Sequence, residues 1–146
     1  MKRDRSSRRQ SYPHAPNLLL KLSDEHRSLL HRLAGMADEQ GVALYLVGGV
    51  VRDLLLRRKN LDLDLTVEGD GLAFARLVCR QFRATSTRFE QFSTARVRLP
   101  NGLKLDIAST RRESYAHAAA LPSVEPASVR EDLYRRDFTI NAMAIG

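Results

Sequence analysis

The segment LDLDLTV at residues 61–67 constrains the fold more than any other part of the chain. Apolar and polar side chains alternate through it, and a period of two is typical of a β-strand with one buried face. Asp62 and Asp64 would then project together from the other face, roughly 7 Å apart at their Cα atoms. Two carboxylates held side by side repel each other unless a cation lies between them. The pair therefore indicates either a divalent-metal site or the wet face of an ordinary strand.

A second alternating run, at residues 103–108, carries another acid. Its apolar side chains alternate with polar ones, so Asp106 is predicted to face away from the core as Asp62 and Asp64 do. If the two strands are neighbours, three carboxylates converge, which is the minimum equipment of a two-metal phosphoryl-transfer centre. That adjacency is a hypothesis. Carboxylate oxygens are hard ligands that suit Mg²⁺ or Mn²⁺, so Asp62 and Asp64 are our candidate metal ligands.

A glycine pair lies upstream, between an apolar run at residues 42–47 and a predicted helix. Gly48 and Gly49 would let backbone N–H groups approach a phosphate closely. Arg52 follows in the first helical turn and could form paired hydrogen bonds to phosphate oxygens. Most glycine pairs mark only tight turns, so the interest of this one comes from its position shortly before Asp62.

A cluster of charged and amide side chains lies near the end of the chain. It comprises Arg135, Arg136, Asp137 and Asn141. One reading is an exposed helix end with an internal ion pair. The other is a clamp for a triphosphate and a ribose, because arginine and amide groups bind phosphate and hydroxyl oxygens.

The remaining patterns predict an α+β domain with a mixed sheet of about five strands flanked by helices. The predicted strands cover residues 42–47, 61–67, 84–90, 94–99 and 103–108. The predicted helices cover residues 18–41, 50–58, 72–82 and 131–144. Ser23 fits a helix N-cap, and Asn101 with Gly102 predicts a hairpin turn. Residues 111–129 are predicted to form a loop.

The charge of the chain is concentrated at its start. The formal net charge is +7, and residues 1–10 hold five basic residues and one acid. Residues 1–17 are therefore predicted to form a disordered basic leader, and the balance favours polyanionic partners. The single cysteine excludes a disulfide framework within the chain. No apolar run is long enough for a membrane span, so we expect a cytoplasmic protein that does not enter the membrane.

Four segments together resemble a known family. They are YLVGGVVRDLLL, LDLDLTVEGD, KLDIASTRRESY and EDLYRRDFTINAMA, in that order. They resemble the head domain of the class II, or bacterial-type, tRNA nucleotidyltransferases and poly(A) polymerases, a family within the DNA polymerase beta superfamily. The resemblance covers residues 42–146. It implies a DNA polymerase beta-like nucleotidyltransferase fold for those residues.

The resemblance also implies a reaction. The 3′-hydroxyl of an RNA, most often the tRNA 3′ end, attacks the α-phosphate of ATP or CTP, and pyrophosphate leaves. On the matching positions, Asp62 and Asp64 would hold two Mg²⁺ ions, and Asp106 would help to activate the hydroxyl. The outcome would be addition of CCA or of A alone to tRNA.

The resemblance assigns the nucleotide-binding groups as well. Gly48, Gly49 and Arg52 would hold the triphosphate. Arg136 would bind the nucleotide together with Asp137 and Asn141, and Arg135 is a further candidate.

The chain departs from the family pattern in two ways that matter here. Ser93 stands where many relatives have glycine before the threonine. Relatives also continue into a helical neck, body and tail, which carry the nucleotide-selecting motif and the tRNA grip. We therefore expect that these regions are absent and that a separate helical chain could complete the protein.

Two other functions fit the same residues. The head could belong to a poly(A) polymerase, because the parts that distinguish the two classes lie beyond Gly146 in relatives. Alternatively, the chain is a non-catalytic nucleotide- or RNA-binding module, with the basic leader supplying salt-dependent affinity. Nucleotide turnover discriminates between these classes.

Overall fold

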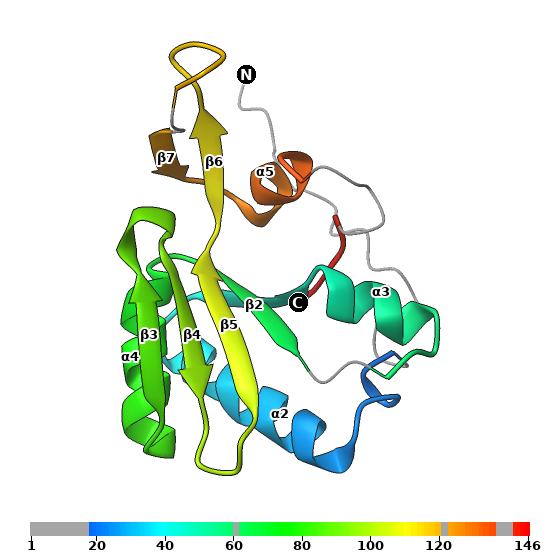
Figure 1. The fold of residues 1–146 in the computed structure, drawn as a ribbon. Helices are drawn as coiled ribbons and strands as arrows, with labels where there is room; N and C mark the ends of the chain where they lie inside the picture. Colours follow the sequence, from blue (N-terminus) through cyan, green and yellow to red (C-terminus); the bar gives the residue numbers. More distant parts are fainter. Residues whose placement is uncertain (1–17, 60–61, 121–122, 137–141) are drawn as a thin grey trace, which may run out of the picture.

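Six strands form one mixed sheet in the computed structural model, which describes residues 18–59, 62–120, 123–136 and 142–146 (Figure 1). The strand order is β3-β4-β5-β2-β1-β8. The strands of this sheet are β1 (Ala43–Val47), β2 (Leu63–Glu68), β3 (Thr85–Phe89), β4 (Thr94–Arg98), β5 (Lys104–Ser109) and β8 (Ala144–Ile145). The helices are α2 (Asp24–Glu39), α3 (Gly49–Leu55), α4 (Gly71–Phe82) and α5 (Val129–Tyr134), with a short 3₁₀ turn η1 (Glu90–Phe92). The predicted α+β class with a mixed sheet is confirmed.

The strands β2 and β5 lie side by side and run parallel, although β2 precedes β5 by two other strands in the chain. The other pairings in this sheet are antiparallel. Leu63 is the register partner of Leu105, and Asp64 is the register partner of Asp106. The adjacency that the carboxylate hypothesis needed is therefore present.

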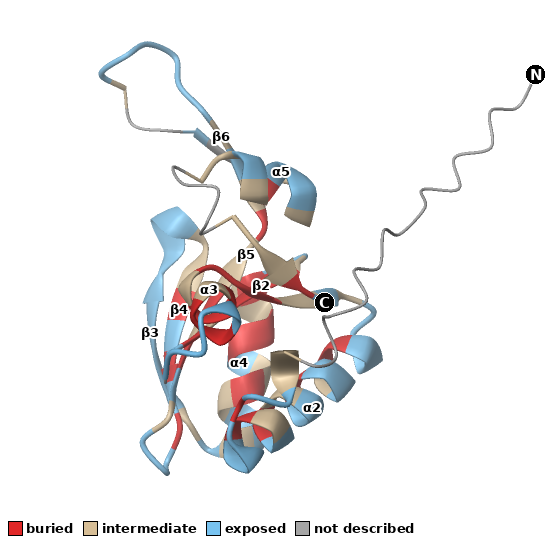
Figure 2. Cartoon of the chain, turned by 90° about the vertical axis from the view of Figure 1, so that its right-hand side faces the viewer, coloured by how far each residue is buried: buried red, intermediate tan, exposed pale blue. Residues whose placement is uncertain are grey.

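The apolar residues of the alternating runs form the core. One face of β2, β4 and β5 buries Leu63, Leu65, Val67, Ala95, Val97, Leu105 and Ile107. Helix α4 packs behind β3, β4 and β5 in Figure 1, and Figure 2 shows the buried residues gathered between the sheet and its helices. Full burial of one such side chain contributes roughly 1.5–3 kcal/mol to the stability of the fold. Because side chains alternate along a strand, the face of β3–β5 opposite α4 carries the polar side chains of the same runs.

Helix α4 begins where its backbone touches β5. Asp70 caps the helix by accepting a hydrogen bond from the Ala73 N–H, and the Gly71 N–H donates to the Ser109 hydroxyl at 2.9 Å. A β-carbon at position 71 would lie 2.6 Å from the backbone of Ala108, closer than packed atoms approach. Gly71 thus permits the contact that holds α4 against the strand carrying Asp106.

The predicted first helix is present as α2, and Ser23 caps it by accepting a hydrogen bond from the His26 N–H. The predicted loop at 111–129 is wrong in part, because it contains β6 (Arg111–Ser114) and β7 (Ser123–Pro126), which pair antiparallel in a separate two-stranded sheet. Charged residues dominate these short strands, and the Arg112–Glu125 ion pair at 2.7 Å joins them. Without apolar alternation, the sequence carried no strand signal there.

The helix predicted at 131–144 is also wrong in its extent. A capping box between Ser128 and Glu131 starts α5 at Val129, and the helix ends at Tyr134. Further on, Ala144 and Ile145 form β8 by pairing with Val47 and Leu46 of β1. This pairing is a tertiary contact, which explains both the helix overprediction and the sixth strand.

Ser93 adopts a left-handed backbone conformation, with φ 49° and ψ 42°, after η1. Glycine reaches this region at lower cost than other residues, so glycine would be the less strained residue at this position. The Ser109 N–H donates to the Ser93 carbonyl oxygen at 3.0 Å. The turn is therefore tied to β5 despite the change.

Some predictions fall outside the described residues. They concern the leader at 1–17, Leu61 at the start of the alternating run, Asp137 and Asn141. In the part of the chain that the structure describes, no helix is both long enough and apolar enough to span a membrane.

Candidate active site

Three carboxylates gather on the face of the sheet opposite α4. Asp64 on β2 lies directly across from Asp106 on β5, and Asp62 immediately precedes β2. Adjacent strands are about 4.8 Å apart, so the register brings the two side chains together. A polar pocket of about 160 Å³ is lined by Asp62, Leu63, Arg96, Lys104 and Asp106. The backbone register thus brings Asp64 and Asp106 together, and Asp62 lies near enough for its charge to act on Asp64.

Asp64 is the electrostatically strained member of this group. Burial raises the pKa of its carboxyl above the ordinary value, and the negative charges of Asp106 and Asp62 raise it further. Arg136 and Arg96 act in the opposite direction but do not cancel the effect. A half-buried carboxylate next to two others favours a bound cation, because a cation removes the repulsion.

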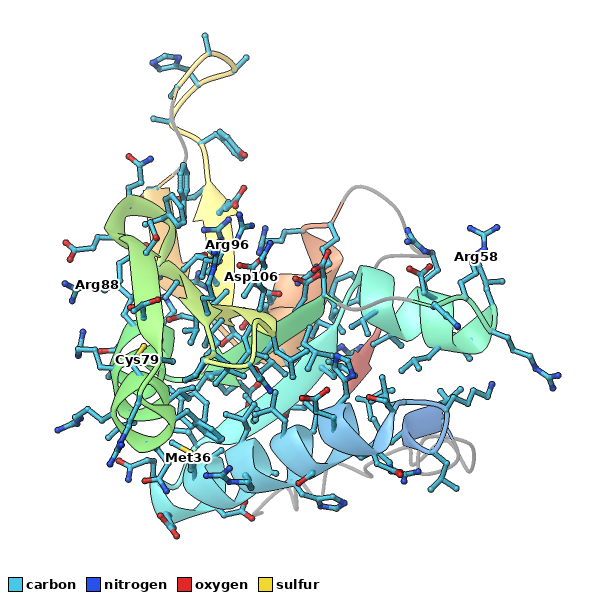
Figure 3. The ribbon with its side chains drawn as sticks, turned by 60° about the horizontal axis from the view of Figure 1, so that its bottom comes forward. Met36, Arg58, Cys79, Arg88, Arg96 and Asp106 are labelled. Carbon is cyan, nitrogen blue, oxygen red and sulfur yellow. The ribbon has the colours of Figure 1, made fainter. Side chains whose placement is uncertain are left out.

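Asp106 is neutralised by an arginine that the sequence analysis missed. Arg96 on β4 donates from Nε to Asp106 Oδ1 at 2.8 Å and from Nη2 to Oδ2 at 3.0 Å (Figure 3). The hydrogen bonds to Asp106 raise the pKa of Arg96. The signal was available, because Arg96 alternates with buried Ala95 and Val97 and so must share the face of Asp106.

The carboxylates supply part of what a divalent cation requires. Within the described ranges, no group of three His, Cys, Asp or Glu side chains is already assembled for a metal. Asp62 and Asp64 nevertheless fit Mg²⁺, which is usually bound through one or two carboxylates with water and substrate phosphates completing the shell. The raised pKa of Asp64 is the observation that favours a cation at this place.

The glycine turn lies against the same carboxylate. Gly48 has φ 73° and precedes α3. A β-carbon at position 48 would lie 3.5 Å from Arg136 Nη1 and 3.8 Å from Asp64 Oδ2. Gly48 therefore leaves the space between a guanidinium and a carboxylate open, as a phosphate site requires.

Arg52 lies beside the turn but is already engaged. Its Nε donates to Asp53 Oδ1 at 2.8 Å. A β-carbon at Gly49 would lie 3.5 Å from Arg52 Nη2, so the guanidinium borders the glycine pair. The structure thus groups Gly48, Gly49, Arg52 and Arg136 on the β1 side of the carboxylates.

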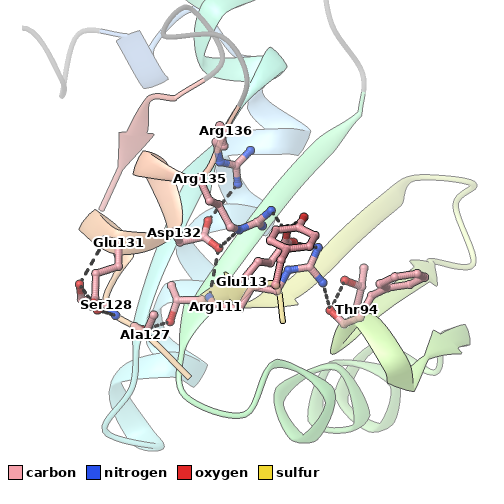
Figure 4. Close-up of polar contacts among 12 residues, drawn as sticks. Thr94, Arg111, Glu113, Ala127, Ser128, Glu131, Asp132, Arg135 and Arg136 are labelled. Carbon is pink, nitrogen blue, oxygen red and sulfur yellow. Dashed lines mark hydrogen bonds and ion pairs between the residues drawn. The ribbon is translucent and has the colours of Figure 1, made fainter. Parts of the chain in front are cut away.

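A buried aspartate in α5 organises the two neighbouring arginines (Figure 4). Asp132 is fully buried and accepts hydrogen bonds from Arg135 Nε at 3.0 Å and from Arg136 Nη2 at 3.2 Å. It also accepts the backbone N–H of Arg111 at the start of β6, at 3.1 Å. The sequence analysis did not single out Asp132, because a lone acid in a helix carries no distinctive signal.

The two arginines have different surroundings. Arg135 also donates to Glu113 of β6 at 3.3 Å, so it ties α5 to β6. Arg136 instead extends toward Gly48 and Asp64, and its buried Nε has no acceptor among the described residues. Of the two, Arg136 is the one that lies next to the glycine turn.

Together these features are typical of one class of protein. The mixed sheet carries paired aspartates next to a glycine turn and a guanidinium, the equipment of a nucleotidyltransferase head. Residues 44–146 match the family model described as the poly A polymerase head domain. The chain therefore belongs to this family.

Relatives with related names are similar over most of the chain. It is 48% identical over 118 residues to an A-adding tRNA nucleotidyltransferase of Geobacter sulfurreducens and 46% identical over 124 residues to one of Halalkalibacterium halodurans. These matches cover 81% and 85% of this chain, but only 13% and 29% of the respective relatives. The chain thus spans less than a third of the length of either relative.

Solved structures share the fold. An apo form of a CCA-adding enzyme matches with a TM-score of 0.83 and 41% identity, over 90% of this chain and 31% of that one. A Thermotoga maritima CCA-adding enzyme complexed with tRNA matches with a TM-score of 0.74 and 40% identity, over 89% of this chain and 28% of that one. The DNA polymerase beta-like fold expected from the resemblance is confirmed by these matches.

Proposed function

We propose that this chain is the catalytic head of a tRNA nucleotidyltransferase, which transfers AMP or CMP from ATP or CTP to an RNA 3′-hydroxyl, with the tRNA 3′ end as acceptor. The observation that carries the proposal is the parallel register of β2 and β5. It sets Asp64 beside Asp106, next to Gly48 and Arg136. Relatives named for A and CCA addition support the choice of acceptor and nucleotides.

In this proposal the side chains act mainly by position and charge. Arg136, Arg52 and the glycine turn hold the triphosphate, and Asp62 and Asp64 hold two Mg²⁺ ions, with Mn²⁺ as an alternative. The bound ions supply charge neutralisation at the reacting phosphate and at the attacking and leaving oxygens. Phosphoryl transfer needs little else from a protein, because its chemistry depends on alignment and electrostatic stabilisation.

Asp106 is proposed to receive the proton of the attacking 3′-hydroxyl. In the structure both of its carboxylate oxygens accept hydrogen bonds from Arg96, which occupy the positions that a substrate hydroxyl would need. The role therefore requires that Arg96 shift away from one carboxylate oxygen when the acceptor arrives. Asp137 and Asn141 remain proposed ribose contacts.

The Arg96–Asp106 pair also favours a second candidate function, a nucleotide- or RNA-binding module without turnover. A neutralised third carboxylate is compatible with binding and unfavourable for proton transfer. A poly(A) polymerase head would carry the same groups.

A separate helical chain is a further proposed partner, tested by co-purification and mass measurement.

Nucleotide incorporation tests the proposal directly. The chain is mixed with Mg²⁺, labelled ATP or CTP and a tRNA lacking its 3′ end, alongside Asp64→Asn. We expect incorporation by the wild type and a loss of at least about a hundredfold in the variant, because the variant lacks a ligand that organises the charged centre. The nucleotide that is preferred then separates A addition from CCA addition.

The control is the fold of the variant, followed by circular dichroism. Incorporation that persists in a folded Asp64→Asn chain contradicts the assigned metal ligand. Binding of nucleotide and RNA without incorporation by the wild type supports the binding module instead.

A further inference from the structure

The carboxylates lie between two separate sets of cations. On the β1 and α5 side are Arg52 and Arg136, next to the glycine turn. On the β4 and β5 side are Arg96, Arg98 and Lys104. A triphosphate is a single anion of limited reach, and the proposed function places it on the first side. The second set then needs an explanation of its own.

The face that carries the second set is defined by strand register. Arg98 pairs with Lys104 across β4 and β5, and Arg96 pairs with Asp106. Both arginines alternate with the buried residues Val97 and Leu99, so they share the face opposite α4. On β3, Thr85 and Thr87 are the partners of Arg98 and Arg96 and add exposed hydroxyl groups.

Two of these cationic side chains have no polar partner among the described residues. Arg98 and Lys104 are exposed, and in the described part of the chain neither side chain makes a hydrogen bond or an ion pair. Lys104 nevertheless lines the same pocket as Asp62 and Asp106. Arg96, in contrast, is held by Asp106. The free positive charge of this face therefore comes from Arg98 and Lys104.

Reaction geometry assigns an occupant to this face. In phosphoryl transfer the attacking and leaving oxygens lie roughly in line, on opposite sides of the phosphorus atom. If pyrophosphate leaves on the Gly48 and Arg136 side, the attacking hydroxyl must arrive from the opposite side of the carboxylates, which is the β4–β5 side. The group that carries this hydroxyl is itself a polyanion.

We propose that the open face of β3, β4 and β5 holds the backbone of the acceptor RNA strand, with Arg98 and Lys104 contacting the phosphates that precede its 3′ end. This inference rests on the proposed function. Phosphate contacts of this kind position a strand without reading its bases, and threonine hydroxyls such as those of Thr85 and Thr87 commonly add to them. The positive charge complements RNA and disfavours a basic protein partner.

The test removes both charges while keeping side chains of similar length, in Arg98→Gln/Lys104→Gln. Binding of a fluorescent single-stranded RNA is measured by anisotropy with Mg²⁺ and without nucleotide. The RNA is about ten nucleotides long, which falls within common site sizes for single strands. We expect the Kd to rise about tenfold near physiological salt. The slope of log Kd against log salt should fall by about 1.4, because each lost contact to single-stranded RNA removes about 0.7.

The matched control is Arg76→Gln/Arg80→Gln, which removes the same charge from exposed positions on α4, behind the sheet. That pair should change the Kd and the slope far less. In the incorporation assay, the test variant should raise the KM for RNA and leave the KM for ATP unchanged. The single variants, each with about half of the slope change, serve if the double variant fails to fold.

The outcomes separate this surface from the proposed activity. A test variant that binds RNA with wild-type Kd and slope overturns the surface, even if the chain incorporates nucleotide. Equal losses in the α4 control overturn it as well, as does a wild type that binds no RNA. The predicted losses without incorporation by the wild type would keep the surface and remove the proposed activity.

Discussion

Asp64 shows how one half-buried carboxylate can lower the stability of a chain while it is ionised. Its pKa is raised first by burial and then by the charges of Asp106 and Asp62. Between the ordinary pKa of an aspartate and this raised value, the folded chain binds more protons than the unfolded chain. Stability in the absence of a metal must therefore fall as the pH rises through that window.

Replacing Asp64 by Asn removes this cost. Without Mg²⁺ at neutral pH, we expect Asp64→Asn to melt a few degrees above the wild type, and the difference should vanish as the pH falls below the window. Addition of Mg²⁺ should raise the melting temperature of the wild type and leave that of the variant unchanged. NaCl at equal ionic strength is the control for screening. A variant that is less stable than the wild type at neutral pH would contradict the strained carboxylate.

At the scale of elements, the site depends on how α5 is fastened to β6. Asp132 accepts the Arg111 backbone N–H of β6 and also holds the side chains of Arg135 and Arg136 at the end of its own helix. Arg135 adds a link to Glu113, and Val129 N–H donates to Glu68 of β2. Together these contacts place the end of α5 over the carboxylates and direct Arg136 toward Gly48.

Asp132→Ala should release this arrangement. Removing one partner from a buried ion pair leaves the others uncompensated, so we expect a loss of about 3 kcal/mol in the free energy of unfolding, measured with urea. Glu131→Ala is the matched control, since Glu131 is the exposed neighbour that caps α5 and makes only a solvent-exposed ion pair with Arg112 at 3.8 Å, of a kind that contributes little to stability. Its loss should be much smaller. Equal losses in the two variants would show that Asp132 acts only through helix stability.

At the scale of the whole molecule, the groups of the described site are suited to recognising a ligand by its charge more than by its shape. Its side chains near Asp64 are carboxylates and guanidinium groups, and its glycine turn offers space to a phosphate. In the proposed function these groups hold phosphates and cations, so none of them is assigned to a base edge.

We therefore expect ATP, CTP and inorganic tripolyphosphate to stabilise the chain to a similar extent in the presence of Mg²⁺. The measurement is the rise in melting temperature with ligand concentration, which reports the affinity of each ligand for the folded chain. Adenosine without phosphates is the control and should give no rise. A rise for one nucleotide that far exceeds that for tripolyphosphate would show that these residues bind a base.

Much of this arrangement could be predicted from local patterns. Alternation with a period of two identified β2 and β5, and it placed Asp62, Asp64 and Asp106 on the polar face. The reason is that a strand that buries one face must repeat every second residue. Helix α4 could be predicted similarly from its 3.6-residue period. The hairpin of β4 and β5 could be predicted from Asn101 and Gly102, because this residue pair itself favours the backbone angles of a tight hairpin turn.

The remaining features were decided by contacts between distant segments. The parallel pairing of β2 with β5, the attachment of β8 to β1 and the pairing of β6 with β7 join residues far apart in the chain. So do the Arg96–Asp106 pair and the approach of Arg136 to Asp64. The position of a residue in the alternating pattern determines which face of its own strand it occupies, because the alternation depends only on neighbouring peptide units. Which strand lies beside it depends on burial and hydrogen bonding of the whole chain, and only the tertiary structure decides that.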